Sequence, residues 1–200
     1  KMLKISEMTD EELAMAYVNG NNKAFDLLLE RNQSKLFSYI LFIVHDKEMA
    51  EDLFQETFVK IISKLHEGKY CSSGKFVSWM LRIAHNAVMD WFRRQKNEKA
   101  MAVYDENDLY SDTPSAGILD VNIENHFVKE QVLSDVQRMM NLLPITQREV
   151  VFMRFYQDLS FKEIAELTNV SINTALGRMR YAVMNMRRMA AANGVALQLD

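Results

Sequence analysis

Proline, glycine and cysteine are scarce in this chain, which has two, six and one of them among its 200 residues. Proline and glycine interrupt helices, so their scarcity favours a largely helical protein. The single cysteine, Cys71, excludes an internal disulfide framework and fits a reducing compartment. Cys71 is also a poor candidate nucleophile, because its neighbours Tyr70, Ser72 and Ser73 supply no base.

The sequence also lacks long apolar runs and the usual features of an active site. No stretch approaches the roughly 20 apolar residues that span a bilayer, and no signal peptide opens the chain. We therefore expect a cytoplasmic protein without membrane insertion. The four histidines are scattered, and neither metal-ligand spacing nor a glycine-rich phosphate loop occurs. We expect no catalytic residues, no metal and no cofactor, and hence no enzyme.

The net charge of −3 is unevenly distributed along the chain. Residues 131–190 contain eight basic and five acidic side chains, whereas residues 96–130 contain three basic and eight acidic ones. Phosphate binding depends on local charge, so the C-terminal part can bind nucleic acid although the net charge of the whole chain is negative. The overall balance argues against tight DNA binding by the chain alone.

An acidic, turn-prone stretch at residues 97–125 has the composition of a linker. No strand pattern of useful length and no internal repeat is present on either side of it. We predict an all-α fold of two small helical domains, residues 1–96 and 126–200, joined by this linker.

Apolar residues at helical spacing predict four helices before the linker, at about 10–18, 23–44, 47–65 and 75–95. Thr9 and Glu12 are expected to form a capping box for the first helix. The second helix is either continuous or interrupted near Asn32.

Two further helices are predicted between the linker and residue 160. One spans about 125–143 and ends at Pro144, which cannot continue it. The other spans about 150–156, behind a capping box of Thr146 and Glu149.

Residues 160–181 have the pattern of a helix-turn-helix. Ser160 and Glu163 form a capping box for its first helix, and Ser171 caps the second. We expect one side of the second helix to be buried: Ile172, Ala175, Met179, Ala182 and Met186. We expect the outer side to hold Asn173, Thr174, Gly177, Arg178, Tyr181 and Asn185, with Arg180 at its edge. Such a face fits the DNA major groove, and an ordinary helix pair in a bundle is the alternative.

Two further helix faces point to partners. The outer side of the third helix combines Asp52, Gln55 and Glu56 with Val59, and is either solvated surface or a docking site for a basic partner. The outer side of the fourth helix presents Trp79, Arg82, Asn86, Asp90 and Arg93. An outward tryptophan indicates either contact with the preceding loop or a stacking platform for an unpaired base. That loop includes Lys69 and Tyr70 and could close over such a base.

Two blocks of this sequence resemble bacterial extracytoplasmic-function (ECF) sigma factors. The first resembles sigma domain two in the strings Asp52-Leu53-Phe54-Gln55-Glu56-Thr57-Phe58, Phe76-Val77-Ser78-Trp79-Met80-Leu81-Arg82-Ile83-Ala84-His85-Asn86 and Asp90-Trp91-Phe92-Arg93-Arg94. The second resembles sigma domain four in Leu143-Pro144, Gln147-Arg148-Glu149-Val150, Arg154-Phe155 and Leu159-Ser160-Phe161-Lys162-Glu163-Ile164-Ala165. The resemblance implies a promoter-specificity subunit of RNA polymerase.

The resemblance also implies roles for the faces above. The third-helix residues would dock on the clamp helices of core polymerase: Asp52, Gln55, Glu56 and Val59. The next group would recognise and open the −10 promoter element: Lys69, Tyr70, Trp79, Arg82, Asn86, Asp90 and Arg93. The last group would bind the −35 element: Ser171, Asn173, Thr174, Gly177, Arg178, Arg180 and Tyr181. The acidic linker would thread polymerase near the RNA exit path.

The implied partners are core RNA polymerase, promoter DNA and an anti-sigma factor, and we expect the free chain to be a monomer. Leu176 stands where the family usually has a basic residue, and Gly177 where it has a serine or similar residue, so an altered −35 preference is expected. The alternative function is an autonomous helix-turn-helix regulator with an N-terminal dimerisation or sensing bundle.

Overall fold

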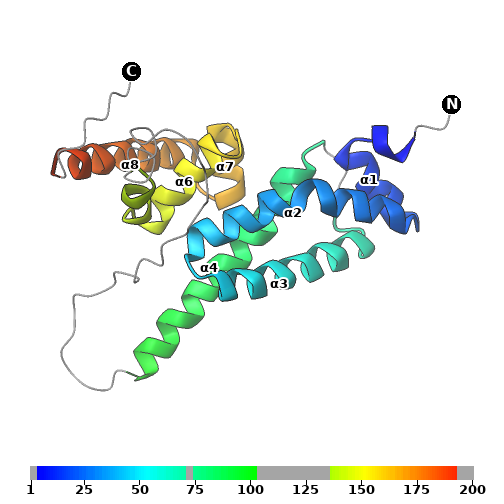
Figure 1. Ribbon diagram of the computed structural model, residues 1–200, viewed down its shortest axis with the longest axis horizontal. Helices are drawn as coiled ribbons and strands as arrows, with labels where there is room; N and C mark the ends of the chain where they lie inside the picture. Colours follow the sequence, from blue (N-terminus) through cyan, green and yellow to red (C-terminus); the bar gives the residue numbers. More distant parts are fainter. Residues whose placement is uncertain (1–3, 71–73, 103–135, 193–200) are drawn as a thin grey trace, which may run out of the picture. The chain divides into compact units, whose positions relative to one another are not determined.

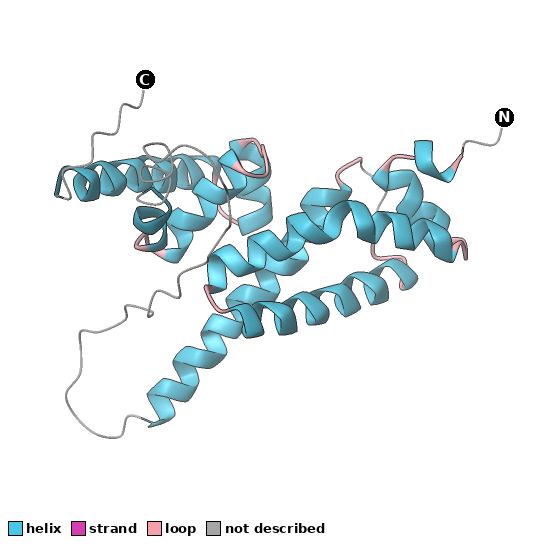
Figure 2. Cartoon of the chain, in the orientation of Figure 1, coloured by secondary structure: helices cyan, strands magenta, loops and turns pink. Residues whose placement is uncertain are grey.

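The computed structural model describes residues 4–70, 74–102 and 136–192, although not the side chains of 98–102. All regular structure in these ranges is helical (Figure 2), so the fold is all-α. The chain divides into two compact units after Glu106. None of the described helices is long and apolar enough to cross a bilayer.

The N-terminal unit is a four-helix arrangement preceded by a short 3₁₀ turn, Ile5–Glu7 (Figure 1). Its helices are α1 (Asp10–Val18), α2 (Asn22–Val44), α3 (Lys47–His66) and α4 (Phe76–Ala102). Helix α2 packs against the other three. The large side chains that are most deeply buried in this unit are Leu13, Leu36, Tyr39, Ile40, Ile43, Leu53, Ile61, Leu65, Met80 and Leu81. Burying each such aliphatic side chain contributes about 1.5–3 kcal/mol relative to leaving it exposed.

The starts of α1 and α3 follow local capping signals. Thr9 Oγ1 accepts a hydrogen bond from the Glu12 amide at 3.3 Å, and the Glu12 carboxylate accepts one from the Thr9 amide at 2.8 Å. The capping box predicted for α1 is therefore confirmed.

The break considered near Asn32 does not occur, because α2 is continuous. The Asn32 side chain is 1% exposed, and its amide donates to Asp10 Oδ2 at 2.9 Å and to the Leu28 carbonyl at 3.0 Å. These bonds satisfy the buried amide nitrogen and leave the helix intact, whereas Asn32 Oδ1 has no hydrogen-bond partner within the described residues.

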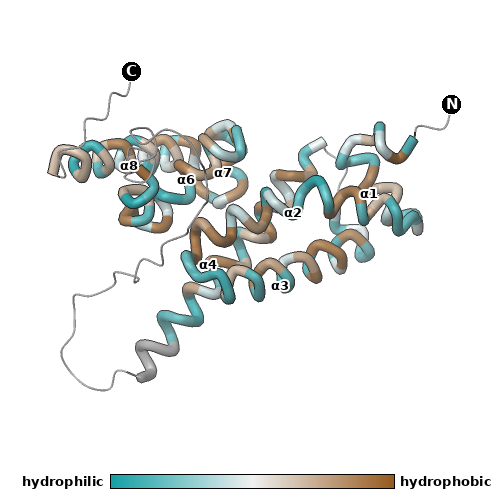
Figure 3. Tube along the Cα trace, viewed as in Figure 1, coloured by the Kyte–Doolittle hydropathy of each residue, from teal (hydrophilic) through white to brown (hydrophobic). Residues whose placement is uncertain are grey.

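Helix α4 extends past its predicted end. It runs through Ala102, so residues 97–102 of the predicted linker are helical, while residues 103–125 lie outside the described part of the chain. The last turns of α4 before residue 98 are strongly hydrophilic (Figure 3), and Arg93 and Arg94 are exposed there. Residues 93–97, Arg-Arg-Gln-Lys-Asn, contain no apolar side chain to bury.

The C-terminal unit contains α6 (Ile145–Phe155), α7 (Phe161–Thr168) and α8 (Ile172–Ala192), preceded by helical residues 136–141. The earlier part of the helix predicted at 125–143 lies outside the described residues. Helix α6 packs on both α7 and α8.

The capping box predicted at Thr146 and Glu149 is wrong. Helix α6 begins at Ile145, directly after Pro144, and has no side-chain cap. Pro144 needs no hydrogen-bond acceptor for its nitrogen and already has a backbone suited to a helix entry, with φ −51° and ψ 143°. Glu149 is fully buried, so its side chain is unavailable to an exposed helix start.

Candidate protein and nucleic-acid interfaces

The outer side of α3 brings together three of the four residues predicted to dock on a protein. Asp52, Gln55 and Val59 are exposed, Val59 by 64%. Glu56 is half-buried: its Oε1 accepts a hydrogen bond from Lys60 Nζ at 2.6 Å, and its Oε2 lies 3.8 Å from Arg94 Nη2. Among the described residues Asp52 has no partner, so the face offers one unpaired carboxylate, an amide and an apolar side chain, with a second carboxylate partly neutralised at its edge.

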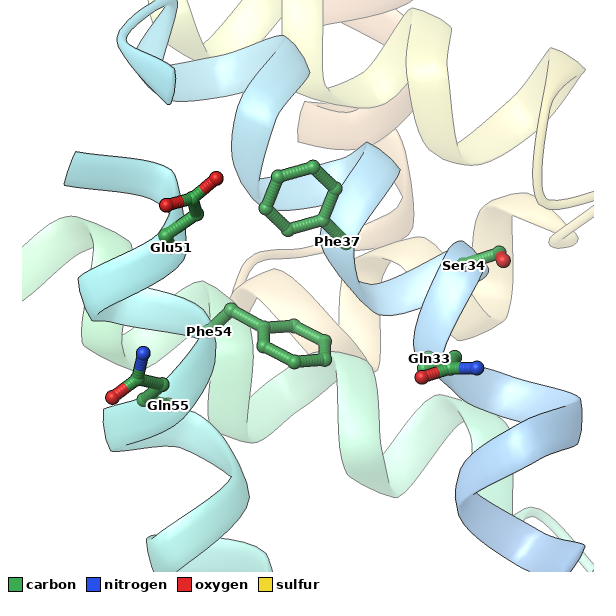
Figure 4. Close-up of a pocket in the computed structure, with 6 residues that line it drawn as sticks. All are labelled: Gln33, Ser34, Phe37, Glu51, Phe54 and Gln55. Carbon is green, nitrogen blue, oxygen red and sulfur yellow. The ribbon is translucent and has the colours of Figure 1, made fainter. Parts of the chain in front are cut away.

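A groove between α2 and α3 adjoins this face (Figure 4). Its volume is about 420 Å³, and its lining residues are Gln33, Ser34, Phe37, Glu51, Phe54 and Gln55. The rings of Phe37 and Phe54 point into the space between the helices, with their centroids 5.7 Å apart and edge to face. Because Gln55 lines the groove and also lies on the exposed face, the two surfaces are continuous.

The outer side of α4 places four polar residues in a row. Arg82, Asn86, Asp90 and Arg93 are exposed and follow one another at intervals of four, four and three residues, which is one side of a helix. Asp90 Oδ1 accepts a hydrogen bond from Arg93 Nη1 at 2.6 Å. The Asn86 amide makes no hydrogen bond within the described ranges and offers two donors and one acceptor to a base edge or phosphate.

Trp79 and Tyr70 differ from the prediction of an open aromatic platform. Trp79 is half-buried, with its ring centroid 4.8 Å from that of Tyr70 and 5.7 Å from that of Phe76. Tyr70 is only 7% exposed, and its hydroxyl donates a hydrogen bond to the Glu11 carboxylate of α1. Trp79 thus contacts the preceding loop, as the alternative interpretation held. The cause is that clustered rings bury apolar surface that an outward tryptophan would leave wet.

Electrostatics around this loop follow from burial and close pairing. Burial, and then the Glu11 carboxylate, raise the pKa of the Tyr70 phenol well above its ordinary value. Lys69 is exposed and pairs with Glu67, and this partner lowers the pKa of the Glu67 carboxyl. Lys69 therefore lies at the surface where it was predicted, whereas Tyr70 does not.

The helix-turn-helix forms as its sequence predicts. Ser160 and Glu163 make a reciprocal capping box at the start of α7. Asn169 ends α7 in the left-handed conformation, with φ 56°, which asparagine tolerates better than most residues. Ser171 Oγ accepts a hydrogen bond from the Thr174 amide at 3.0 Å and so caps α8.

Most of the residues predicted for DNA contact lie on the surface of α8. Ser171, Asn173, Thr174, Arg180 and Tyr181 are exposed, while Gly177 and Arg178 are half-exposed. Within the described ranges neither Arg178 nor Arg180 has an ion-pair partner, so both charges are available to phosphates. Asn185 is different: its amide donates to Gln147 Oε1 of α6 at 2.9 Å, so it belongs to the packing between helices.

Ile172 was assigned to the buried side and is instead 47% exposed. Helix α8 docks through Ala175, Ala182 and Ala190, which are at most 3% exposed, and Ile172 lies one turn before the first of these contacts. Leu176 is also 43% exposed. The helical repeat alone did not show that Ile172 and Leu176 are exposed. The alanines at 175 and 182 were a signal, because such small residues allow α8 to pack closely on its neighbours through an adjacent side.

Comparison with known proteins identifies both units. The Sigma-70 region 2 family model matches residues 28–98, and the Sigma-70, region 4 model matches residues 133–179. Together the two matches cover more than half of the chain, one within each unit. No group of three or more histidine, cysteine or acidic side chains suited to a metal ion occurs within the described ranges.

Characterised relatives match over most of their length. The chain is 26% identical to the ECF RNA polymerase sigma factor SigX of Bacillus subtilis, over 74% of each protein. It is 24% identical to the RNA polymerase sigma-H factor of Pseudomonas aeruginosa, over 88% of this chain and 90% of the relative. It is 26% identical to the ECF RNA polymerase sigma-E factor of Escherichia coli K12, over 86% and 90% respectively.

Solved structures show the same fold. The sigma factor RpoE, in complex with the anti-sigma factor NepR from Bartonella quintana, aligns with a TM-score of 0.63 at 20% identity, over 84% of this chain and 98% of that one. CnrH, in complex with the cytosolic domain of CnrY, aligns with a TM-score of 0.64 at 20% identity, over 92% and 97%. With region 2 followed by region 4 in one all-α chain, this protein belongs to the sigma-70 family as an ECF sigma factor.

Proposed function

We propose that this chain binds core RNA polymerase and directs it to a specific set of promoters, an activity that belongs in the cytoplasm. The observation that supports this most strongly is the presence of region 2 and region 4 in one chain. An autonomous regulator needs only the helix-turn-helix, and would leave the exposed acidic side of α3, with its 64% exposed Val59, without a purpose.

The α3 face is our candidate for the polymerase contact. Asp52 and Gln55 provide polar complementarity to a basic partner, and the exposed Val59 provides an apolar contact one turn further along α3. Glu56, held by Lys60 and Arg94, contributes at the edge.

The α4 face is our candidate for the −10 element. Asn86 is placed to bind a base edge, with Arg82 and Arg93 on the same side to contact phosphate and Asp90 orienting Arg93. Lys69 adds a positive charge from the loop. In the free chain Trp79 rests on Tyr70, so we propose that Tyr70 supports Trp79 and that strand opening draws on binding energy from captured bases.

The start of α8 is our candidate for the −35 element. Hydroxyl and amide groups of Ser171, Asn173 and Thr174 lie on its first turn, where a recognition helix meets base edges. Further along, Arg178, Arg180 and Tyr181 are placed for the DNA backbone, and Gly177 permits close approach.

We further propose regulation by an anti-sigma factor that covers these faces. Two proteins of the same fold, RpoE and CnrH, have structures in complex with such a factor or with a cytosolic domain of a second protein.

In vitro transcription tests the proposed function. The purified chain is added to core polymerase with a genomic DNA library, and transcript 5′ ends are sequenced. We expect new start sites that share −35 and −10 sequences. Unchanged transcription, together with a specific shift of duplex DNA by the chain alone, would instead establish the autonomous regulator.

A further inference from the structure

Two exposed aliphatic side chains lie on the first two turns of the recognition helix. Ile172 is 47% exposed and Leu176 is 43% exposed, and residues four apart are neighbours on a helix surface. The packing of α8 depends instead on Ala175 and Ala182, both fully buried. Folding therefore does not require an aliphatic residue at either position.

The surroundings of this pair fit DNA better than a protein partner. The hydroxyls of Ser171 and Thr174 lie on the same turn as Ile172, and Arg178 and Arg180 follow over the next two turns. Within the described ranges these two arginines have no ion-pair partner. The Ser171 and Thr174 hydroxyls bond to each other and cap the helix, and the two arginine charges beside this helix start match the phosphates that border a major groove.

We infer that Ile172 and Leu176 select thymines in the −35 region by contacting their C5-methyl groups in the major groove. The inference rests on the proposed function. Among the groups that identify bases in that groove, the thymine methyl is the apolar one, whereas the other bases are identified by hydrogen-bond donors and acceptors. An aliphatic side chain pressed against those polar atoms would remove their water without replacing its hydrogen bonds.

Gly177 supports this placement. It follows Leu176 directly, and a Cβ built on it would have no atom within 4 Å, so no contact inside the protein explains a glycine there. Glycine is among the least favourable residues in a helix interior. Its absence of a side chain lets the backbone of α8 come close to DNA beside Leu176.

The test begins with a selection. The full-length chain and core polymerase form the holoenzyme, which is incubated with duplexes randomised across the −35 region, and the bound DNA is sequenced. We expect thymine to be enriched at one position or at a few clustered positions. Each enriched thymine is then replaced by deoxyuridine, which removes only the methyl group. We expect about fourfold weaker holoenzyme binding for each methyl that the pair contacts.

Variants assign the effect to residues. In Ile172→Ser and Leu176→Ser the difference between thymine and deoxyuridine should disappear at the position each residue contacts. Met184→Ser is the matched control, because Met184 is a 44% exposed apolar residue further along α8, and it should keep the full difference. Unchanged thermal melting by circular dichroism verifies that each variant is folded.

Equal binding of thymine and deoxyuridine duplexes would overturn the inference while leaving the proposed function intact, provided that the holoenzyme still selects promoters. A uniform loss of binding to every sequence in the serine variants would also overturn it, and would indicate a protein contact. Failure of the chain to form a holoenzyme is a separate result that removes the proposed function itself.

Discussion

At the scale of single residues, Tyr70 connects three parts of the N-terminal unit. Its ring packs on Phe76 and Trp79 of α4, and its hydroxyl donates to Glu11 of α1. Any movement of Trp79 towards DNA therefore changes the environment of Tyr70. Both tryptophans of the chain lie in α4, so tryptophan fluorescence monitors this unit and not the helix-turn-helix.

The raised pKa of Tyr70 predicts a loss of stability in alkali. The unfolded chain releases the phenolic proton at about pH 10, before the folded chain does. The contribution of Tyr70 is thus complete below pH 10 and is lost as the pH rises further. Urea unfolding followed by tryptophan fluorescence should give a lower midpoint at pH 11 than at pH 8. In Tyr70→Phe this drop should be smaller, and stability at pH 8 should fall by about 1 kcal/mol.

Asn86→Ala is predicted to impair promoter opening and to spare polymerase binding. It removes an exposed amide without disturbing the buried side of α4, so folding should be unaffected. Permanganate footprinting of unpaired thymines should show roughly tenfold less opening. Transcription from a template already unpaired at the −10 element should recover in part. Loss of holoenzyme formation would show that Asn86 belongs to the polymerase contact.

Residue exposure was the least predictable property. The helical repeat accounts for the burial of Leu53, Ile61 and Leu81, because those positions lie at the centre of a wide apolar side. The helical repeat did not predict the burial of Tyr70, which follows a helix and is buried through contacts with α1 and α4. The helical repeat also predicted burial for Ile172, which is exposed, because burial there depends on how far the neighbouring helices extend. Contacts between distant segments decide these cases, and no local pattern contains them.

At the scale of elements, local signals were dependable where the cap is exposed. The pairs Thr9 with Glu12 and Ser160 with Glu163 form the expected boxes. The same spacing at Thr146 and Glu149 does not, because Pro144 sets the helix start and Glu149 is buried. Capping energies of about 1 kcal/mol are too small to outweigh tertiary packing of that kind.

Gly177→Ala and Gly20→Ala should have opposite effects on stability. A Cβ meets no atom within 4 Å at either position, but Gly177 is helical and Gly20 has a φ of +95°. Alanine should therefore stabilise α8 by about 0.5–1 kcal/mol at position 177 and strain the backbone at position 20. Urea unfolding by circular dichroism measures both.

Gly177→Ala should nevertheless weaken −35 binding by the holoenzyme, since its methyl group would occupy space next to DNA. Stronger or unchanged binding by this more stable variant would show that DNA does not approach α8 closely at that point.

At the scale of the whole molecule, the two units carry separate candidate binding surfaces on one chain. A net charge of −3 disfavours tight DNA binding by the free protein. Polymerase can overcome this by holding both units near one promoter, which raises the effective concentration of each surface at its site. We expect the free chain to bind duplex DNA weakly and in a strongly salt-dependent manner, as a fluorescence anisotropy titration at two ionic strengths would show.

Charge reversal on α3 tests the polymerase contact. Asp52→Lys should lower affinity for core polymerase by tenfold or more, because it places a positive charge opposite a basic partner. Glu30→Lys on α2 is the matched control: it also replaces an exposed carboxylate and changes the net charge equally. Competition binding against a labelled sigma factor measures both. Similar losses in the two variants would point to overall charge and not to the α3 face.

The anchoring of α8 by alanines has a consequence for how such proteins diverge. Because Ala175, Ala182 and Ala190 hold the helix in place, the side chains that protrude from its first turns contribute little to folding. With the proposed thymine contacts, a single mutation at Ile172 or Leu176 would redirect the protein to other genes at little cost in stability. Duplicated copies of such a gene could acquire separate regulons in a few steps, each through intermediates that still fold.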